Sequence, residues 1–234
     1  MALDARRITG LADGAGVSTW SDLSGNANDA TQGTSGNRPA YTLNAQGGQP
    51  TVRFDGSNDY LSFATGIFTY TGDATVIALV KTSGGASEYG SVITENNNTV
   101  VQTSIGCQMT VFPNAGPELC TDVYAPGGMR YNSTCSTDAH VARWQWQNWS
   151  THKSNGNTSL AIDGVANGGT AYGSNPLAFT SSNKNIGRFD ATGSGGSHLA
   201  MDLSALYVWA VALAAPLRKR IEQHLAFAFK VAIS

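Results

Sequence analysis

Short apolar segments separated by clusters of turn-forming residues recur along the whole chain. Residues 51–56 alternate apolar and polar side chains and end in an Asp-Gly pair, which favours a tight turn. Residues 74–81 are apolar on both faces and rich in β-branched side chains, which is typical of a central strand. Residues 159–166 form a hairpin pattern with a second Asp-Gly pair at the tip. This spacing predicts an all-β chain made of many short strands.

Further strands are predicted between these segments, at residues 60–63, 90–94, 100–111, 141–149, 185–189 and 198–210. Residues 113–137 are rich in Pro, Asn, Gly and Ser, and we interpret them as a long loop excursion. Loops of that length are usually functional, and we expect residues 113–137 to serve as a contact arm between subunits if the protein assembles.

One segment near the end of the chain has a helical period instead of an alternating one. Pro216 suits the first turn of a helix, and Leu217, Ile221, Leu225 and Phe229 follow at intervals of four residues. Apolar residues make up 41% of the chain, which is enough for one sizeable core. We find neither a repeat nor a linker. Residues 1–234 are therefore expected to form one domain, an antiparallel two-sheet sandwich with one C-terminal α-helix.

The charge pattern argues against two classes of partner. The chain has 14 basic and 16 acidic residues, a net charge of −2, and no basic stripe that could neutralise phosphates. We therefore expect no nucleic-acid partner. No apolar run reaches the roughly 18 to 20 residues that span a bilayer, and the first residues lack the apolar region of a secretion signal. We expect no membrane partner.

The three cysteines, Cys107, Cys120 and Cys135, fall within one stretch of the chain. Their odd number and wide spacing argue against a zinc site, which prefers closely spaced pairs. Two interpretations stay open. Cys120 and Cys135 form a disulfide if the protein acts outside a reducing cytosol, or all three cysteines are buried free thiols.

Six segments carry short motifs in a characteristic order: Leu3-Asp4-Ala5, Trp20 to Ala30, Pro50 to Leu61, Ile162-Asp163-Gly164, Ile186-Gly187-Arg188 and Leu206 to Lys230. Together they resemble the concanavalin A-like lectin/glucanase superfamily, in particular the laminin-G-like domains of phage structural proteins and secreted bacterial proteins. The resemblance implies a jelly-roll sandwich. It is a poor guide to function, because the fold carries lectins, glycanases, adhesion modules and viral structural parts.

A search for catalytic motifs is negative. Retaining glycanases place two carboxylates about 5 to 5.5 Å apart, which on a strand requires acidic residues at alternate positions. The four glutamates, Glu88, Glu95, Glu118 and Glu222, have no acidic residue two positions away. The chain also lacks a GxSxG elbow, an HExxH motif and a P-loop. We therefore expect a protein that is not an enzyme.

One loop offers a candidate ion site. Asp22, Ser24, Asn26, Asn28 and Asp29 place hard oxygen ligands at close spacing, which suits Ca²⁺, the single candidate cofactor. The bidentate glutamate of an EF-hand is missing. The alternative is that the Asx side chains of the loop bind the backbone of their own turn and hold no ion. The loop from Asp55 to Asp59 has the same two interpretations, and there we expect Asp59 to support the turn.

A second cluster is a candidate for glycan binding, because aromatic rings stack on sugars while amides bind hydroxyl groups. Its residues are Tyr131, Trp146, Gln147, Asn148 and Trp149. The alternative is that one tryptophan face of this predicted strand belongs to the core. Trp149, near the strand end, is the better candidate for an exposed ring.

The predicted role is a non-catalytic structural or binding module. The first hypothesis is a phage virion component, a capsid decoration or tail-associated protein, made in the host cytoplasm and contacting the capsid shell. The second is a free-standing or secreted, extracellular lectin that binds surface glycans. A glycan-active enzyme ranks last. A homo-oligomer is expected in the first two cases.

Overall fold

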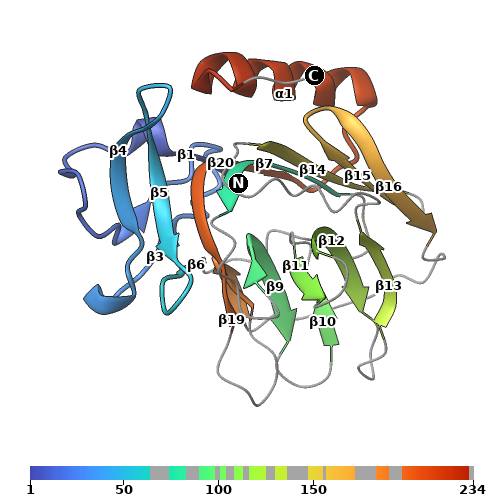
Figure 1. Cartoon of the computed structure of the whole chain (residues 1–234), viewed down its shortest axis with the longest axis horizontal. Helices are drawn as coiled ribbons and strands as arrows, with labels where there is room; N and C mark the ends of the chain where they lie inside the picture. Colours follow the sequence, from blue (N-terminus) through green and yellow to red (C-terminus); the bar gives the residue numbers. More distant parts are fainter. Residues whose placement is uncertain are drawn as a thin grey trace.

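The computed structural model describes residues 1–63, 74–82, 90–97, 101–103, 108–112, 116–124, 130–135, 147–154, 157–171, 183–189 and 197–231. Within these residues the chain forms two large antiparallel sheets that pack face to face, with one helix outside them (Figure 1). This is the all-β sandwich with one C-terminal helix that the sequence predicts.

The larger sheet has eight strands in the order β16-β15-β14-β7-β20-β5-β4, and β1 pairs with β20 beside this row. Its strands are β1 (Ala2–Asp4), β4 (Ala40–Gln46), β5 (Gln49–Asp55), β7 (Ala74–Thr82), β14 (Gln147–Ser154), β15 (Asn157–Ile162), β16 (Val165–Ala171) and β20 (Ala200–Trp209). Strand β20 lies in the middle because it pairs with β7 on one side and with both β5 and β1 on the other.

The facing sheet has six strands in the order β10-β9-β17-β6-β3-β2. These are β2 (Thr19–Trp20), β3 (Ala30–Thr31), β6 (Leu61–Phe63), β9 (Ile93–Asn97), β10 (Val101–Thr103) and β17 (Asn183–Ile186).

Two smaller sheets complete the described strands. They contain β8 (Gly90–Ser91), β11 (Gln108–Phe112), β12 (Gly116–Tyr124) and β13 (Arg130–Cys135) in one, and β18 (Arg188–Phe189) with β19 (Ser197–His198) in the other. Two short 3-10 turns, η1 (Ala5–Arg7) and η2 (Ser35–Asn37), lie in the N-terminal part.

The hydrophobic core lies between the two large sheets. Strand β7 contributes Val76, Ala78 and Val80 to it, and Leu61 and Ile186 reach it from the facing sheet. Because successive residues of a strand point to opposite faces, the remaining residues of β7 pack on the outer face of the larger sheet. Ile77 and Leu79 there form a second cluster with α1 (Ala215–Phe229). Strand β7 is apolar on both faces because both of its faces are covered.

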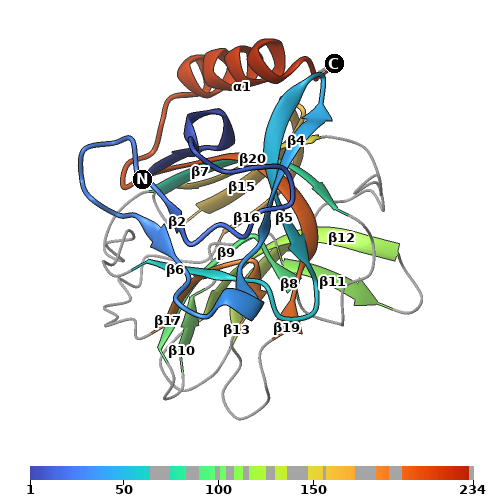
Figure 2. The same ribbon diagram turned by 90° about the vertical axis from the view of Figure 1, so that its left-hand side faces the viewer.

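The helix covers the outer face of the larger sheet, opposite the six-stranded sheet (Figure 2). It has Pro216 in its first turn, as predicted, and ends at Phe229, where the left-handed backbone of the next residue, Lys230, terminates it. Leu225 and Phe229 are buried, but Leu217 is exposed. The prediction for Leu217 is wrong because steps of four residues advance 400° around a helix and drift by about 40° each time. The buried face follows Glu222, Leu225, Ala226 and Phe229 instead.

Two local predictions have opposite outcomes. The predicted hairpin is confirmed: β15 and β16 are joined by Asp163 and Gly164, whose positive φ values of 52° and 81° suit a tight two-residue turn. The predicted loop excursion at 113–137 is wrong for most of its length, since it contains β12 and β13. Its Pro and Gly content favours a loop, whereas the two strands depend on pairing with each other and with β11.

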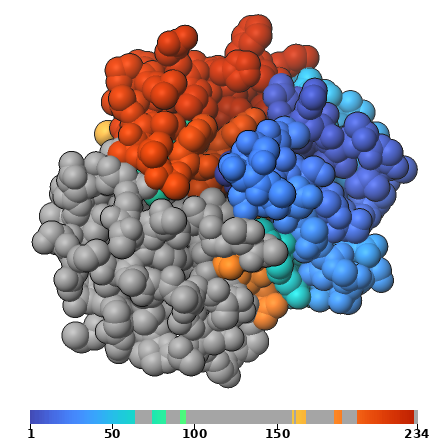
Figure 3. Space-filling view, turned by 180° about the vertical axis from the view of Figure 1, so that it is seen from behind, coloured from blue at the N-terminus to red at the C-terminus, as the bar shows by residue number. Residues whose placement is uncertain are grey.

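The two ends of the described chain lie together. The N-terminal amine of Met1 donates to the Val208 carbonyl oxygen at 3.1 Å, and the guanidinium carbon of Arg6 lies 4.4 Å from the centre of the Phe229 ring. The space-filling view shows the N-terminal and C-terminal segments, blue and red, side by side on one face (Figure 3). Among the described residues, α1 is the only α-helix. No helix there is long and apolar enough to cross a membrane.

Candidate ligand-binding site

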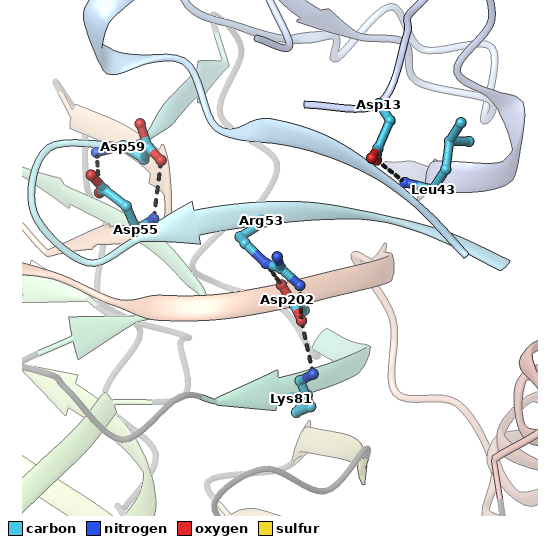
Figure 4. Close-up of polar contacts among 7 residues, drawn as sticks. All are labelled: Asp13, Leu43, Arg53, Asp55, Asp59, Lys81 and Asp202. Carbon is cyan, nitrogen blue, oxygen red and sulfur yellow. Dashed lines mark hydrogen bonds and ion pairs between the residues drawn. The ribbon is translucent and has the colours of Figure 1, made fainter. Parts of the chain in front are cut away.

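A turn at the end of β5 is built around two carboxylates (Figure 4). Asp55 Oδ1 accepts hydrogen bonds from the backbone N–H groups of Ser57, Asn58 and Asp59 at 2.8, 3.1 and 3.3 Å. Asp59 Oδ2 accepts the N–H of Asp55 at 3.0 Å. Each carboxylate therefore holds the backbone of the other residue, which is the supporting role that the sequence predicts for Asp59.

The two carboxylates differ in their pKa. Burial alone would raise the pKa of Asp55, but the three backbone N–H groups and the nearby His198 outweigh it, and this pKa lies below its ordinary value. Burial is the main reason that the pKa of Asp59 is raised to about 6. The hydrogen bond from the Asp55 N–H opposes this change, and the charge of Asp55 adds to it. At neutral pH the turn therefore holds two negative charges, one favoured and one disfavoured.

Tyr60, the residue after this turn, has a cationic side chain and an imidazole close to its ring. The guanidinium carbon of Arg188 lies 4.8 Å from the centre of the Tyr60 ring, within range of a cation–π contact. The imidazole of His198 lies 6.2 Å from the Tyr60 ring, centre to centre, at an interplanar angle of 48°. All three side chains are partly exposed. We call Tyr60, Arg188 and His198 the Tyr60 cluster.

Backbone pairing fixes this cluster. Arg188 and His198 are directly opposite each other in the β18–β19 ladder, so their side chains lie on the same face. Gly187 precedes Arg188 with φ +84°, and a Cβ there would collide with the ring of Phe54. Gly56 in the acidic turn has φ +78°, and a Cβ there would lie 2.7 Å from the Cβ of Ala200. Only glycine fits at both positions, because L-residues avoid this backbone region and there is no space.

The Tyr60 cluster has the chemistry of a polar binding site. A tyrosine ring gives a flat apolar surface with a hydroxyl at its edge, and a guanidinium group forms paired hydrogen bonds with carboxylates or neighbouring hydroxyls. Sequence reasoning missed this site because Tyr60 lies more than a hundred residues before Arg188 and His198 in the chain. The signals were present, since Tyr60 and Arg188 both lie in segments that carry the family resemblance.

The candidate calcium loop is a closed hydrogen-bond network. Asp22 Oδ1 accepts the N–H groups of Ala2 and Ser24 at 2.7 and 2.9 Å, and Oδ2 accepts the Ser24 hydroxyl and the Asn28 N–H at 2.7 and 3.1 Å. Asp29 Oδ1 accepts the Asp22 N–H at 2.7 Å. Burial alone would raise the pKa of Asp22, but these donors outweigh it and lower that pKa.

The structure therefore brings the five predicted calcium residues together, since Asn26 also donates to the Ser24 hydroxyl oxygen, at 3.0 Å. An ion bound to Asp22 would compete with four donors of the chain itself. The described part of the chain holds no group of three or more His, Cys, Asp or Glu residues suited to a metal. The side-chain oxygen of Asn28 is buried and has no hydrogen-bond partner. Calcium binding stays a prediction.

The predicted glycan cluster is divided between two sheets. Gln147, Asn148 and Trp149 are the first residues of β14 in the larger sheet, where Trp149 is opposite Ala78 of β7. Tyr131 lies in β13 of the four-stranded sheet. Trp146 falls outside the described residues.

A charged triad crosses the outer face of the larger sheet (Figure 4). The Asp202 carboxylate accepts from Arg53 Nε at 2.6 Å and Nη2 at 3.1 Å, and Lys81 Nζ lies 3.0 Å from its Oδ2. These residues are register partners on β5, β20 and β7. Since the Asp202 side chain is 5% exposed, the two cations compensate its burial, and the triad joins three central strands.

Comparisons with known proteins show similarity at the level of fold. Neither a protein-family model nor a curated protein sequence matches the chain. Among solved structures, the binding domain of Paraclostridial Mosquitocidal Protein 1 superposes with a TM-score of 0.66 at 11% identity, covering 91% of this chain and 51% of that one. The chain shares the β-sandwich fold of that domain.

Two other solved structures have the same architecture. The binding domain of Botulinum Neurotoxin DC in complex with SialylT gives a TM-score of 0.57 at 12% identity, over 90% of this chain and 51% of that one. Trypanosoma rangeli sialidase gives 0.62 at 12% identity, over 99% of this chain and 33% of that one. This chain thus spans about half of the toxin domains and a third of the sialidase. At such identities the likeness concerns the fold alone, which is compatible with the predicted lectin-like jelly roll.

Proposed function

We propose that this protein is a non-catalytic binding module that recognises acidic glycans on surfaces through the Tyr60 cluster. The observation that carries the proposal is the placement of the Arg188 guanidinium over the Tyr60 ring, beside His198, on a partly exposed face. The shared fold supports it, since two of the similar structures are binding domains and one of them was obtained with SialylT bound.

An acidic sugar matches the groups that the cluster offers. Its ring can lie against an aromatic face, and its carboxylate can pair with a guanidinium fork. Asp55, whose charge interacts with His198, accepts three backbone hydrogen bonds through one oxygen and is held in its own turn. Arg188 and His198 are therefore the groups that would distinguish an acidic sugar from a neutral one.

Calorimetric titration with sialyllactose and with lactose tests the proposal. We expect the unmodified protein to bind sialyllactose more tightly than lactose. Arg188→Gln should weaken sialyllactose binding about tenfold or more, because a charge-assisted hydrogen bond contributes about 1.5 to 3 kcal/mol. Lys219→Gln, an exposed charge change on α1, is the matched control and should bind as the unmodified protein does. Equal binding by Arg188→Gln and Lys219→Gln would exclude the Tyr60 cluster.

A third variant separates the two proposed glycan sites. If the ligand binds instead at the cluster predicted from Tyr131, Trp146, Gln147, Asn148 and Trp149, then Trp149→Ala abolishes binding while Arg188→Gln does not. If the protein releases free sialic acid from sialyllactose, and Asp59→Asn abolishes the release, then the protein is an enzyme and the proposed non-catalytic role is wrong.

The carrier of the module is a separate part of the proposal. We retain the phage virion, where the partners would be the capsid shell and further copies of this chain, with an extracellular lectin as the alternative. The protein inventory of purified particles distinguishes the two, because only a virion component stays with the particle.

For Ca²⁺, the thermal midpoint should fall on adding a chelator if the Asp22 loop holds an ion.

A further inference from the structure

Two cysteines that are distant in the sequence occupy directly opposed positions in the four-stranded sheet. Strands β12 and β13 pair antiparallel, and their register places Cys120 opposite Cys135. The next pairs, from Thr121 with Thr134 to Val123 with Asn132, continue without a shift. The cysteine pair therefore belongs to a regular ladder.

Opposed positions in such a ladder suit a disulfide. In antiparallel pairs the opposed Cα atoms are about 4.5 or 5.5 Å apart, depending on the hydrogen-bond class, and their Cβ atoms leave the same face. Disulfides span Cα separations of about 4.4 to 6.8 Å. Both classes of ladder position meet this requirement.

We propose that Cys120 and Cys135 form a cross-strand disulfide when the protein enters an oxidising environment. The register favours the first of the two interpretations that the sequence leaves open, because it places these two cysteines opposite each other. On its other side Cys120 is opposite Gln108 of β11, so the cysteine opposite Cys120 in the described ladders is Cys135. Cys107 then keeps a free thiol. The proposal does not depend on the glycan site.

The reaction needs an oxidant, and glutathione disulfide is sufficient. The thiolate of one cysteine attacks a sulfur of glutathione disulfide, gives a mixed disulfide and releases one glutathione thiolate. The second cysteine attacks the mixed disulfide, forms the protein disulfide and releases the second glutathione. The two protein sulfurs lose two electrons in total, glutathione disulfide gains them, and the two thiol protons go to the glutathione thiolates.

The bond would stabilise the folded chain by restricting its unfolded state. It closes the segment from residue 120 to residue 135, and cross-links over loops of that size commonly raise stability. For a chain of this length we expect the thermal midpoint of the oxidised protein to exceed that of the reduced protein by about 5 to 10 °C.

Thiol counting on the full chain tests the proposal. The protein is equilibrated with a mixture of oxidised and reduced glutathione, denatured, treated with iodoacetamide and analysed by intact mass and peptide mapping. The expected result is one alkylated cysteine, Cys107, and a linked peptide pair containing Cys120 and Cys135. Three alkylated cysteines under all oxidising mixtures, or a link that includes Cys107, would overturn the proposal.

Two serine variants serve as controls. Cys107→Ser should form the same linked peptide pair and leave no cysteine to alkylate. Cys135→Ser should leave two alkylated cysteines and show no difference in thermal midpoint between oxidising and reducing buffers. A midpoint difference that persists in Cys135→Ser would show that another bond is responsible. Sialyllactose titration of the oxidised and reduced protein tests the glycan site independently.

Discussion

Single glycines position the Tyr60 cluster. Gly187 immediately precedes Arg188, and its left-handed backbone turns the chain from β17 into β18. The Phe54 side chain lies where a Cβ of residue 187 would be. Two separate costs therefore exclude any other residue here, a strained backbone and a steric collision with a core ring.

Gly187→Ala should lower the free energy of unfolding by more than about 3 kcal/mol, because the strain of roughly 1 to 2 kcal/mol adds to the collision with Phe54. Gly25→Ala is the matched control. Its φ of +81° is similar, but nothing lies within 4 Å of the added Cβ, so only the strain remains. Urea unfolding of both variants measures the two effects. Equal losses would show that the collision with Phe54 is relieved at little cost.

Residues whose partners are close in the sequence were predictable, and residues brought together by distant strands were not. The turn role of Asp22 follows from local chemistry, because its partners Ser24 and Asn28 are close in the sequence. The Tyr60 cluster depends on two separate strand pairings that bring residues 60, 188 and 198 together, and no local pattern encodes such contacts. Local networks are predictable from one sequence, and clusters formed by long-range pairing are not.

At the scale of elements, helix α1 is held by a few large side chains. Phe229 is fully buried against Ile77, Leu79 and Ala205 of the larger sheet. Arg6 lies over its ring, so the helix also contacts the N-terminal segment. Phe227, two residues earlier, is 87% exposed. The two phenylalanines therefore give a matched pair on one helix.

Phe229→Ala should lower the free energy of unfolding by about 3 to 5 kcal/mol, as expected for truncating a buried aromatic side chain. Phe227→Ala should change it by less than about 0.5 kcal/mol, because an exposed ring loses little contact. Denaturant titrations followed by circular dichroism measure both values. Comparable losses in the two variants would contradict the placement of α1 on the sheet.

The elements differ in how well the sequence predicts them. The β15–β16 hairpin was predictable because its Asp-Gly turn and flanking strands are local. The existence of α1 was predictable from Pro216 and the apolar period, but its buried face was displaced by the drift of the repeat. Strands β12 and β13 were missed because their stability comes from pairing with each other and with β11.

At the scale of the whole molecule, three carboxylates with shifted pKa values make stability depend on pH in opposite directions. The pKa of Asp59 is raised to about 6, so its favourable contribution is complete below about pH 3.8 and is lost as the pH rises through 6. Asp22 and Asp55 have lowered pKa values, so their contributions are present above pH 3.8 and are lost as the pH falls. Stability should therefore be greatest in mildly acidic solution.

Asp59→Asn removes the disfavoured charge and keeps an oxygen that can accept the Asp55 N–H. At pH 7.5 the variant should be more stable than the unmodified protein by about 1 to 3 kcal/mol, since each pKa unit corresponds to about 1.4 kcal/mol. The gain should vanish near pH 4, where the native side chain is protonated. Urea unfolding between pH 4 and 8 measures it. A gain that is constant over this range would show that Asp59 does not titrate as described.

The central position of β20 has a consequence for how the chain folds. Strands β5 and β7 are made early in synthesis, but both pair with a strand that begins only at Ala200. Until β20 emerges from the ribosome, the edges of β5 and β7 that pair with it stay unpaired, and such edges are prone to aggregation. Pairing over this sequence distance also slows folding. The nascent chain therefore completes its larger sheet late, and a truncation before Ala200 should leave insoluble protein.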